Sequence, residues 1–317
     1  MFENMKIGFL FPGQGSQSIG MGKDLYDKYE EVRKIYNKVK ELTNIDIAKI
    51  SFEGPEEELN KTQKTQLAVL TESLAILEIL NTKNIKAISS AGLSLGEYTA
   101  LIEDGILDLE TGVKLVQKRG EIMQNLIPVG NWKMAAIMGL DKEQVEDACL
   151  KVTSGFVRPA NFNTIGQIVI SGEEGAINEA SEYAKECGAR KVTILNTAGP
   201  FHTEKLEKCS IALRKELEKI YIHIKDSKVI KNIDGKAYKK DDDAKDILAK
   251  HIMNPVKFTD CLKTMYENGV DTFIEIGPGK ILSGFVKRIK FEGEIKILNI
   301  NNVETLENVL KEVEVNE

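Results

Sequence analysis

The run G-L-S-L-G at residues 92–96 places a serine, Ser94, between two glycines. This G-x-S-x-G pattern is typical of a nucleophile elbow, a sharp turn from a strand into a helix that exposes the serine hydroxyl. The glycines admit a strained backbone and the close approach of a substrate. The backbone amide of the next residue, Leu95, then points at the oxyanion that forms when the serine attacks a carbonyl carbon. The pattern therefore predicts acyl chemistry on Ser94.

A serine nucleophile needs a general base, and the chain has three histidines. His223 lies in the alternating segment Y-I-H-I-K, where we expect it to face water on a strand edge, and His251 ends a helical stretch. His202 sits in A-G-P-F-H-T-E, a turn that opens a helix with Thr203 as its candidate N-cap. A helix N-terminus disfavours the imidazolium, so a histidine there stays neutral and can accept a proton. We take His202 as the base, while an ordinary surface or core position stays open for each histidine.

The segment P-G-Q-G-S-Q at residues 12–17 follows an expected strand at 6–11. It fails the dinucleotide-binding fingerprint, because Ser18 stands where the third glycine should be. No G-K-[ST] triplet occurs in the chain, so a phosphate-binding loop is not expected. The segment instead indicates a loop that donates backbone hydrogen bonds at the carboxyl end of a strand, with Gln14 presenting its amide.

Strands and helices alternate in the two outer parts of the chain and change order in the middle. The outer parts predict strands at 6–11, 85–91 and 272–276 and helices at 71–80, 97–102 and 109–127. This alternation is typical of a parallel sheet with helices on both faces. The middle predicts strands at 134–138, 156–163, 167–171 and 191–195 and helices at 142–151 and 176–187, which is the ferredoxin-like order βαββαβ. We therefore expect an α/β fold with a hydrolase-like core of residues 1–128 and 199–317 and an inserted ferredoxin-like subdomain of residues 129–198.

Composition excludes several classes of function. The formal net charge of −6 over 317 residues gives no electrostatic support for nucleic-acid binding. No apolar run reaches the ~18 residues that a membrane span needs, and the N-terminus lacks the order of a signal peptide. The four cysteines form no C-x-x-C pair, which argues against a metal site and for reduced thiols in the cytoplasm. Nothing in the sequence demands an oligomer, so we expect a monomer. We also expect no cofactor.

Three motifs together resemble those of malonyl-CoA:acyl carrier protein transacylases: P-G-Q-G-S-Q at 12–17, G-x-S-L-G-E-Y at 92–98 and G-P-F-H at 199–202. Supporting motifs are R-G at 119–120, N-F-N-T-I-G-Q at 161–167, N-P-V at 254–256 and E-I-G-P-G-K-I-L at 275–282. The resemblance extends in order over nearly the whole chain, including the inserted subdomain.

The resemblance implies that Ser94 takes a malonyl group from malonyl-CoA and passes it to the phosphopantetheine thiol of an acyl carrier protein. His202 would remove the serine proton and then protonate the leaving thiolate. A backbone carbonyl near His251 would orient His202, in place of an acidic partner. The backbone amides of Gln14 and Leu95 would form the oxyanion hole.

The resemblance also gives Arg119 a role, although composition alone would leave it as an exposed helical residue. Its guanidinium would bind the free malonyl carboxylate in a bidentate manner. Phe201 would narrow the pocket against an α-methyl branch, and Asn161 and His251 complete the expected substrate-binding set. Two residues depart from the family pattern: Leu93 replaces the usual histidine of the elbow, and His251 replaces a usual glutamine.

Three alternatives stay open at this stage. The chain could be a free-standing acyltransferase of a polyketide pathway, a serine esterase or thioesterase that shares the elbow, or an inactive homologue that only binds carrier protein. The sequence does not identify the carrier-protein docking surface. Its candidate basic residues are Arg158, Arg190, Lys191, Lys287 and Arg288.

Overall fold

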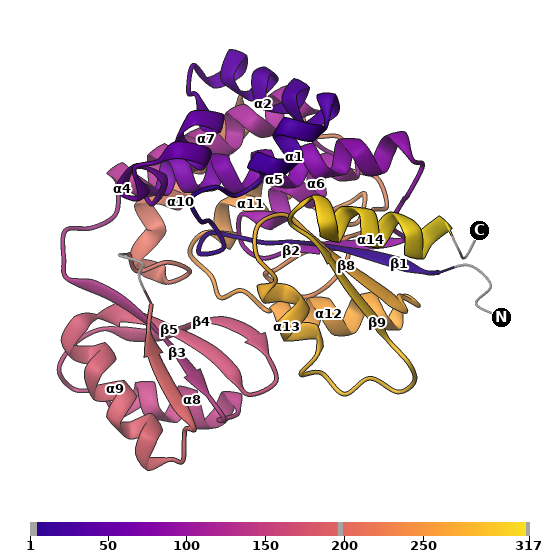
Figure 1. Ribbon diagram of the computed structural model, residues 1–317. Coiled ribbons are helices and arrows are strands. Elements are labelled where there is room, and N and C mark those ends of the chain that lie inside the picture. Colours follow the sequence, from indigo (N-terminus) through magenta and orange to yellow (C-terminus); the bar gives the residue numbers. More distant parts are fainter. Residues whose placement is uncertain (1–4, 196–198, 315–317) are drawn as a thin grey trace.

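The computed structural model describes residues 5–195 and 199–314. Its larger sheet has the strand order β7-β2-β1-β8-β9, and every neighbouring pair in it is parallel (Figure 1). The strands are β1 (Ile7–Phe11), β2 (Ser89–Gly92), β7 (Val229–Ile230), β8 (Thr272–Ile276) and β9 (Lys296–Ile300). Strands β1, β2, β7 and β8 are buried throughout, as a parallel sheet covered by helices requires. The expected α/β fold with a parallel sheet is confirmed.

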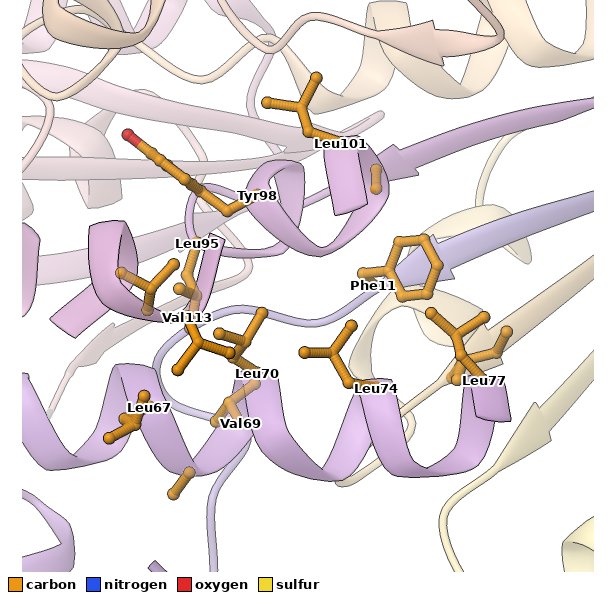
Figure 2. Close-up of a cluster of buried hydrophobic side chains, with 14 of the residues drawn as sticks. Phe11, Leu67, Val69, Leu70, Leu74, Leu77, Leu95, Tyr98, Leu101 and Val113 are labelled. Carbon is orange, nitrogen blue, oxygen red and sulfur yellow. The ribbon is translucent and has the colours of Figure 1, made fainter. Parts of the chain in front are cut away.

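Helices cover both faces of this sheet. They are α1 (Lys23–Lys28), α2 (Glu30–Thr43), α3 (Ile47–Glu53), α4 (Glu56–Leu59), α5 (Thr62–Thr82), α6 (Gly96–Glu103), α7 (Leu109–Asn125), α10 (Glu207–Glu218), α11 (Ala244–His251), α12 (Phe258–Glu267), α13 (Ile281–Val286) and α14 (Val303–Glu314). Helix α5 is buried on nearly all sides, and Figure 2 shows its leucines packed toward Phe11 of β1 and Leu95 of the elbow. In the described part of the chain, no helix is long and apolar enough to cross a membrane.

The second sheet is antiparallel and has the order β4-β5-β3-β6. It contains β3 (Trp132–Met138), β4 (Val157–Thr164), β5 (Gln167–Glu173) and β6 (Lys191–Ile194), with α8 (Lys142–Leu150) and α9 (Glu174–Glu186) on one face (Figure 1). This arrangement is the ferredoxin-like fold expected from the order of elements. Alternate residues of β3 serve different surfaces: Ala135 and Ile137 pack against the helices, and Met134 and Ala136 face the core.

A short backbone connection joins the small sheet to the core. Asn161 of β4 forms an isolated parallel bridge with Val256, which lies in the N-P-V segment after α11. The amide of Phe162 donates to the carbonyl of Val256 at 2.8 Å, and the amide of Val256 donates to the carbonyl of Ala160 at 2.9 Å. The proposed division into residues 1–128 with 199–317 and 129–198 stays a prediction, and its boundary residue 198 lies outside the described residues.

Two local expectations are wrong. Residues 221–225 form no strand, although their burial alternates and His223 is exposed, because no neighbouring strand pairs with them. Strand β2 begins at Ser89, later than expected, because Ile85 follows the turn that ends helix α5, and its amide donates to the carbonyl of Leu80 at 3.0 Å instead of pairing with a strand. The helix expected at 71–80 is confirmed as the second half of α5, which begins at Thr62.

A buried carboxyl on α5 gives a prediction about stability. Glu72 is 1% exposed, neither of its carboxylate oxygens has a hydrogen-bond partner among the described residues, and burial raises its pKa to about 8. Between pH 4.5 and 8 the folded protein therefore holds a proton that the unfolded chain releases, so stability falls as the pH rises. We expect Glu72→Gln to raise the free energy of unfolding by about 2 kcal/mol at pH 7 and to change it little at pH 4.

Urea unfolding at the two pH values checks this expectation. Glu78→Gln, at a half-buried position on the same helix, is the matched control and should give no comparable gain at pH 7. An equal gain from Glu72→Gln at both pH values would contradict the prediction, because the gain would then not come from the proton.

Candidate active site

Ser94 lies in a tight turn between β2, which ends at Gly92, and α6, which begins at Gly96. Its φ angle is +53°, a left-handed conformation that is unusual for a residue with a side chain. A Cβ atom on Gly92 would lie 1.9 Å from the carbonyl carbon of Gly96, and one on Gly96 would lie 2.1 Å from the carbonyl oxygen of Phe11. Both glycines are therefore required by close packing, which explains the G-x-S-x-G spacing.

His202 stands opposite this serine. The Ser94 Oγ atom is 2.8 Å from Nε2 of His202, and the histidine is 4% exposed. Its Nδ1 atom is 3.1 Å from the carbonyl oxygen of His251 and 3.2 Å from that of Asn254. Because carbonyl oxygens only accept, Nδ1 carries the proton and Nε2 is free to accept the serine proton. No carboxylate of the described residues bonds to His202, so two backbone carbonyls hold the ring.

His202 is held in its neutral form. Burial, and then the positive charge of Arg119, lower the pKa of His202 to about 4. The sequence had suggested a helix N-terminus as the cause, with Thr203 as the N-cap. Thr203 does precede a short 3₁₀ turn at Glu204–Leu206, but its hydroxyl donates to the carbonyl of Pro200 at 2.7 Å and caps no amide. The capping expectation is therefore wrong, and burial is the main cause of the low pKa.

Arg119 reaches Ser94 from helix α7. It is 1% exposed, so the expectation of an exposed helical residue from composition is wrong. One terminal nitrogen donates to Oε1 of Gln66 at 2.6 Å, the other donates to Oγ of Ser94 at 3.1 Å, and the guanidinium carbon lies 5.3 Å from the centre of the Tyr98 ring. Within the described residues no carboxylate pairs with Arg119, and its Nε has no hydrogen-bond partner. A buried cation without a counter-ion suits an anionic ligand.

The loop after β1 lies against the elbow. A Cβ atom on Gly13 would lie 2.4 Å from the carbonyl oxygen of Leu93, so this contact depends on glycine. The hydroxyl of Ser16 donates to the carbonyl of Gly13 at 2.8 Å and closes the loop. In the part of the chain that the structure describes, the amides of Gln14 and Leu95 donate to no other protein group. Both amides are thus available to an oxyanion.

A cavity of about 430 Å³ opens at Ser94. Six of the eight site residues expected from the sequence line it: Gln14, Ser94, Arg119, Asn161, Phe201 and His202. Leu95 is buried and contributes only its backbone. The side chain of His251 is 1% exposed and lies behind His202, with 5.3 Å between the ring centres. The substrate-binding role expected for His251 therefore finds no support in its position, because its side chain does not reach the cavity.

Several polar residues of the site escaped the sequence analysis. Gln66 orients Arg119, and its polar side chain in the apolar run of α5 was the one available signal. Asn163 lies in the N-F-N-T motif, lines the cavity and has an unpartnered, buried Oδ1 among the described groups. Asn232 accepts a hydrogen bond from the amide of Ser94 at 2.8 Å, and no motif surrounds it. These contacts arise only when distant segments meet.

Comparison with known proteins places this geometry in a family. A family model described as acyl transferase domain matches residues 8–294. The malonyl CoA-acyl carrier protein transacylase of Bacillus subtilis (strain 168) is 40% identical over 304 residues, covering 95% of each chain. That of Escherichia coli (strain K12) is 38% identical over 286 residues, covering 90% of this chain and 93% of that protein. The chain belongs to the malonyl CoA-acyl carrier protein transacylase family.

Solved transacylases share the whole fold. The structure of malonyl CoA-acyl carrier protein transacylase from Clostridium perfringens superposes with a TM-score of 0.91 at 42% identity and covers 98% of both chains. A malonyl-transacylase in complex with its type II polyketide acyl-carrier protein also has a TM-score of 0.91, at 34% identity, and covers 97% of this chain and 99% of that chain. Both the parallel sheet and the small antiparallel sheet are thus common to this transacylase family.

Proposed function

We propose that the chain transfers a malonyl group from malonyl-CoA to the phosphopantetheine thiol of an acyl carrier protein, and so supplies extender units for fatty-acid synthesis. The observation that carries this proposal is the buried, unpaired Arg119, whose guanidinium lies 3.1 Å from the nucleophile Ser94. A generic serine hydrolase has no need of a cation at this place, whereas a malonyl ester on Ser94 presents a carboxylate there. The family relationship supports the same reaction.

In the first half-reaction, Ser94 attacks the thioester carbonyl of malonyl-CoA. His202 takes the serine proton on Nε2, and its Nδ1–H keeps its bonds to the two backbone carbonyls. The amides of Gln14 and Leu95 donate to the oxyanion of the tetrahedral intermediate. Collapse breaks the carbon–sulfur bond, and His202 returns the proton to the leaving thiolate of coenzyme A. The product is a malonyl ester on Ser94.

The second half-reaction runs through the same groups. His202 removes the proton of the carrier's phosphopantetheine thiol, and the resulting thiolate attacks the ester carbonyl. The bond to Ser94 Oγ breaks, and His202 returns the proton to this oxygen. One base serves both directions because it is neutral at the start of each half-reaction, which its pKa of about 4 ensures at physiological pH.

We propose that residues of the cavity wall select the malonyl group. The terminal nitrogen of Arg119 that donates to Ser94 Oγ would donate to the malonyl carboxylate instead, and the unpartnered Nε could join it, while Gln66 keeps the guanidinium plane in place. Phe201 is largely buried, and its ring packs so close to Gly199 that a Cβ there would lie 2.7 Å away. We propose that this ring leaves no room for an α-methyl branch, and that Asn161, also on the cavity wall, orients the acyl or pantetheine chain.

Carrier protein and coenzyme A both present phosphate groups at the far end of the pantetheine arm. Of the basic candidates, Arg190, Lys191 and Arg288 line a second open cavity of about 850 Å³, beside the β4–β5 turn. Arg158 lies elsewhere and pairs with Glu204 at 3.4 Å. We propose the first three as the docking residues for the acidic carrier. The free thiols of all four cysteines fit our proposal of a cytoplasmic site of action.

Intact-mass measurement tests the proposed reaction. After mixing with malonyl-CoA, one malonyl group should be bound to the protein, and it should move to carrier protein that bears phosphopantetheine but not to carrier that lacks it. Release of free malonate faster than transfer would favour a hydrolase. A chain that binds carrier protein but never becomes labelled would be an inactive homologue. Parallel assays with a fatty-acid carrier and a polyketide carrier separate the two pathways.

The pKa of His202 gives a prediction for the pH dependence of the first half-reaction. Only the neutral imidazole can accept the serine proton, and burial keeps it neutral down to about pH 4. We expect the rate of Ser94 acylation to be constant from neutral pH to about pH 5 and to fall to half near pH 4. Rapid-quench acylation at a series of pH values measures it, with circular dichroism to verify folding. A half-point near the ordinary histidine pKa of 6.5 would contradict the buried environment.

A further inference from the structure

Asn232 connects the two sides of the nucleophile turn. It follows β7, is fully buried, and does not line the substrate cavity. Its Oδ1 accepts the amide hydrogen of Ser94 at 2.8 Å, and its Nδ2 donates to the carbonyl of Gly92 at 2.8 Å. One amide side chain therefore provides hydrogen-bond partners for the carbonyl of Gly92, the last residue of β2, and for the amide of Ser94.

The backbone amide and carbonyl of Asn232 are both hydrogen-bonded. Its amide donates to Oε2 of Glu97 at 2.9 Å, and its carbonyl accepts from the amide of Lys257 at 2.8 Å. Glu97 lies on α6, is fully buried, and accepts at Oε1 from the hydroxyl of Tyr238 at 2.5 Å. The same carboxylate lies 3.6 Å from Nδ1 of His251, too far for a hydrogen bond. The asparagine cannot shift without breaking bonds to three other segments.

This arrangement bears on the reactivity of Ser94 for two reasons. The left-handed conformation of Ser94 is strained, and such a conformation persists only where the surroundings hold it. In addition, the bond to Asn232 occupies the Ser94 amide, which leaves the next amide, that of Leu95, to face the oxyanion. Loss of the Asn232 side chain would leave a buried amide and a buried carbonyl unpaired and would release the turn.

We propose that Asn232 is a positioning residue that holds the Ser94 turn in its reactive geometry and thereby sets the rate of acylation without touching the substrate. This inference rests on the proposed function of Ser94 as the acylated nucleophile. Arg119 comes from α7 and has no bond to Asn232, so binding of the malonyl carboxylate should be independent of it.

The test compares three variants by rapid-quench acylation with malonyl-CoA and by thermal unfolding. Asn232→Ala should lower the acylation rate constant by about a hundredfold, the effect of a misplacement of the order of 1 Å, with KM close to that of the wild type. Asn232→Asp keeps an acceptor for the Ser94 amide but not the amide donor toward Gly92, so it should recover part of the loss. Thr264→Val is the matched control, because it removes a 2.6 Å bond to Gly235 in the same loop without reaching Ser94.

Wild-type acylation by a folded Asn232→Ala would overturn the proposal. The proposal would also be overturned if Asn232→Ala lowered the rate and raised KM to a similar extent, and if Asn232→Asp recovered none of the loss. That pattern would indicate general damage to the fold. If Asn232→Ala does not fold, Asn232→Asp decides: a lower rate at unchanged KM and melting temperature supports the proposal, and an unchanged rate overturns it. Labelling of Ser94 by phenylmethylsulfonyl fluoride, run alongside, still reports the turn if the wild type takes no malonyl group, so failure of the proposed function is distinguishable.

Discussion

Ser94→Ala and His202→Ala are each expected to lower malonyl transfer by at least about 10⁴-fold, and the double variant should be no slower than either one alone. We expect the two side chains to act as a unit, because the 2.8 Å hydrogen bond between Oγ and Nε2 would let His202 activate the hydroxyl. Removing the serine leaves no atom to carry the malonyl group, and removing the histidine leaves a hydroxyl with no base. Quenched acylation followed by intact mass measures both losses.

Two controls isolate the dyad from the other histidines. His223→Ala changes an exposed residue that does not line the cavity, and it should leave transfer unchanged. His251→Gln keeps the backbone carbonyl that holds Nδ1 of His202 and removes a buried ring whose nitrogens bond to no described group, so its effect should be small. Near-normal acylation by His202→Ala would show that another group is the base.

Arg119→Ala is expected to lower kcat/KM for malonyl-CoA by roughly 10² to 10³-fold, the usual consequence of truncating one partner of a buried charge pair. Acetyl-CoA has no carboxylate, so its use should fall far less, and the preference for malonyl over acetyl groups should largely vanish. Arg119→Lys keeps the charge but not the two-pronged donor geometry, and we expect it to be intermediate. Steady-state rates with the two thioesters provide the comparison.

Lys118→Ala is the matched control for Arg119→Ala. The two residues are neighbours on α7, but Lys118 points to solvent and pairs with Glu121, so its loss should affect neither substrate. An unchanged malonyl-to-acetyl ratio in Arg119→Ala would refute the selectivity assignment, even if both rates fell. In that case the guanidinium would serve only the hydroxyl of Ser94, to which it already donates.

The sequence predicted those parts of the site that depend on local backbone geometry. The elbow is one, because the glycines at 92 and 96 are needed within a single turn. The ferredoxin-like subdomain is another, since the order of its strands and helices could be read along the chain. His223 shows the limit of such patterns: its segment alternates in burial, yet forms no strand because no partner strand lies beside it.

Contacts between distant segments could not be predicted in this way. Asn232 stands 138 residues after the serine whose amide it accepts, and Gln66 stands 53 residues before the arginine it orients. The burial of Arg119 also depends on how α5 and α7 pack, which its own helix does not reveal. Family resemblance supplied the role that we propose for Arg119, while the contacts of Gln66 and Asn232 came only from the structure.

The bridge between Asn161 and Val256 has a consequence for protein engineering. The segment that contains Val256 also carries Asn254, whose carbonyl holds the ring of His202, while the strand of Asn161 forms a wall of the substrate cavity. A chimera that takes residues 129–198 from another acyltransferase would inherit only one half of this paired backbone. Such grafts should retain activity best when the donor also supplies residues 254–256. The new cavity wall and the carbonyl that holds His202 would then come from the same protein.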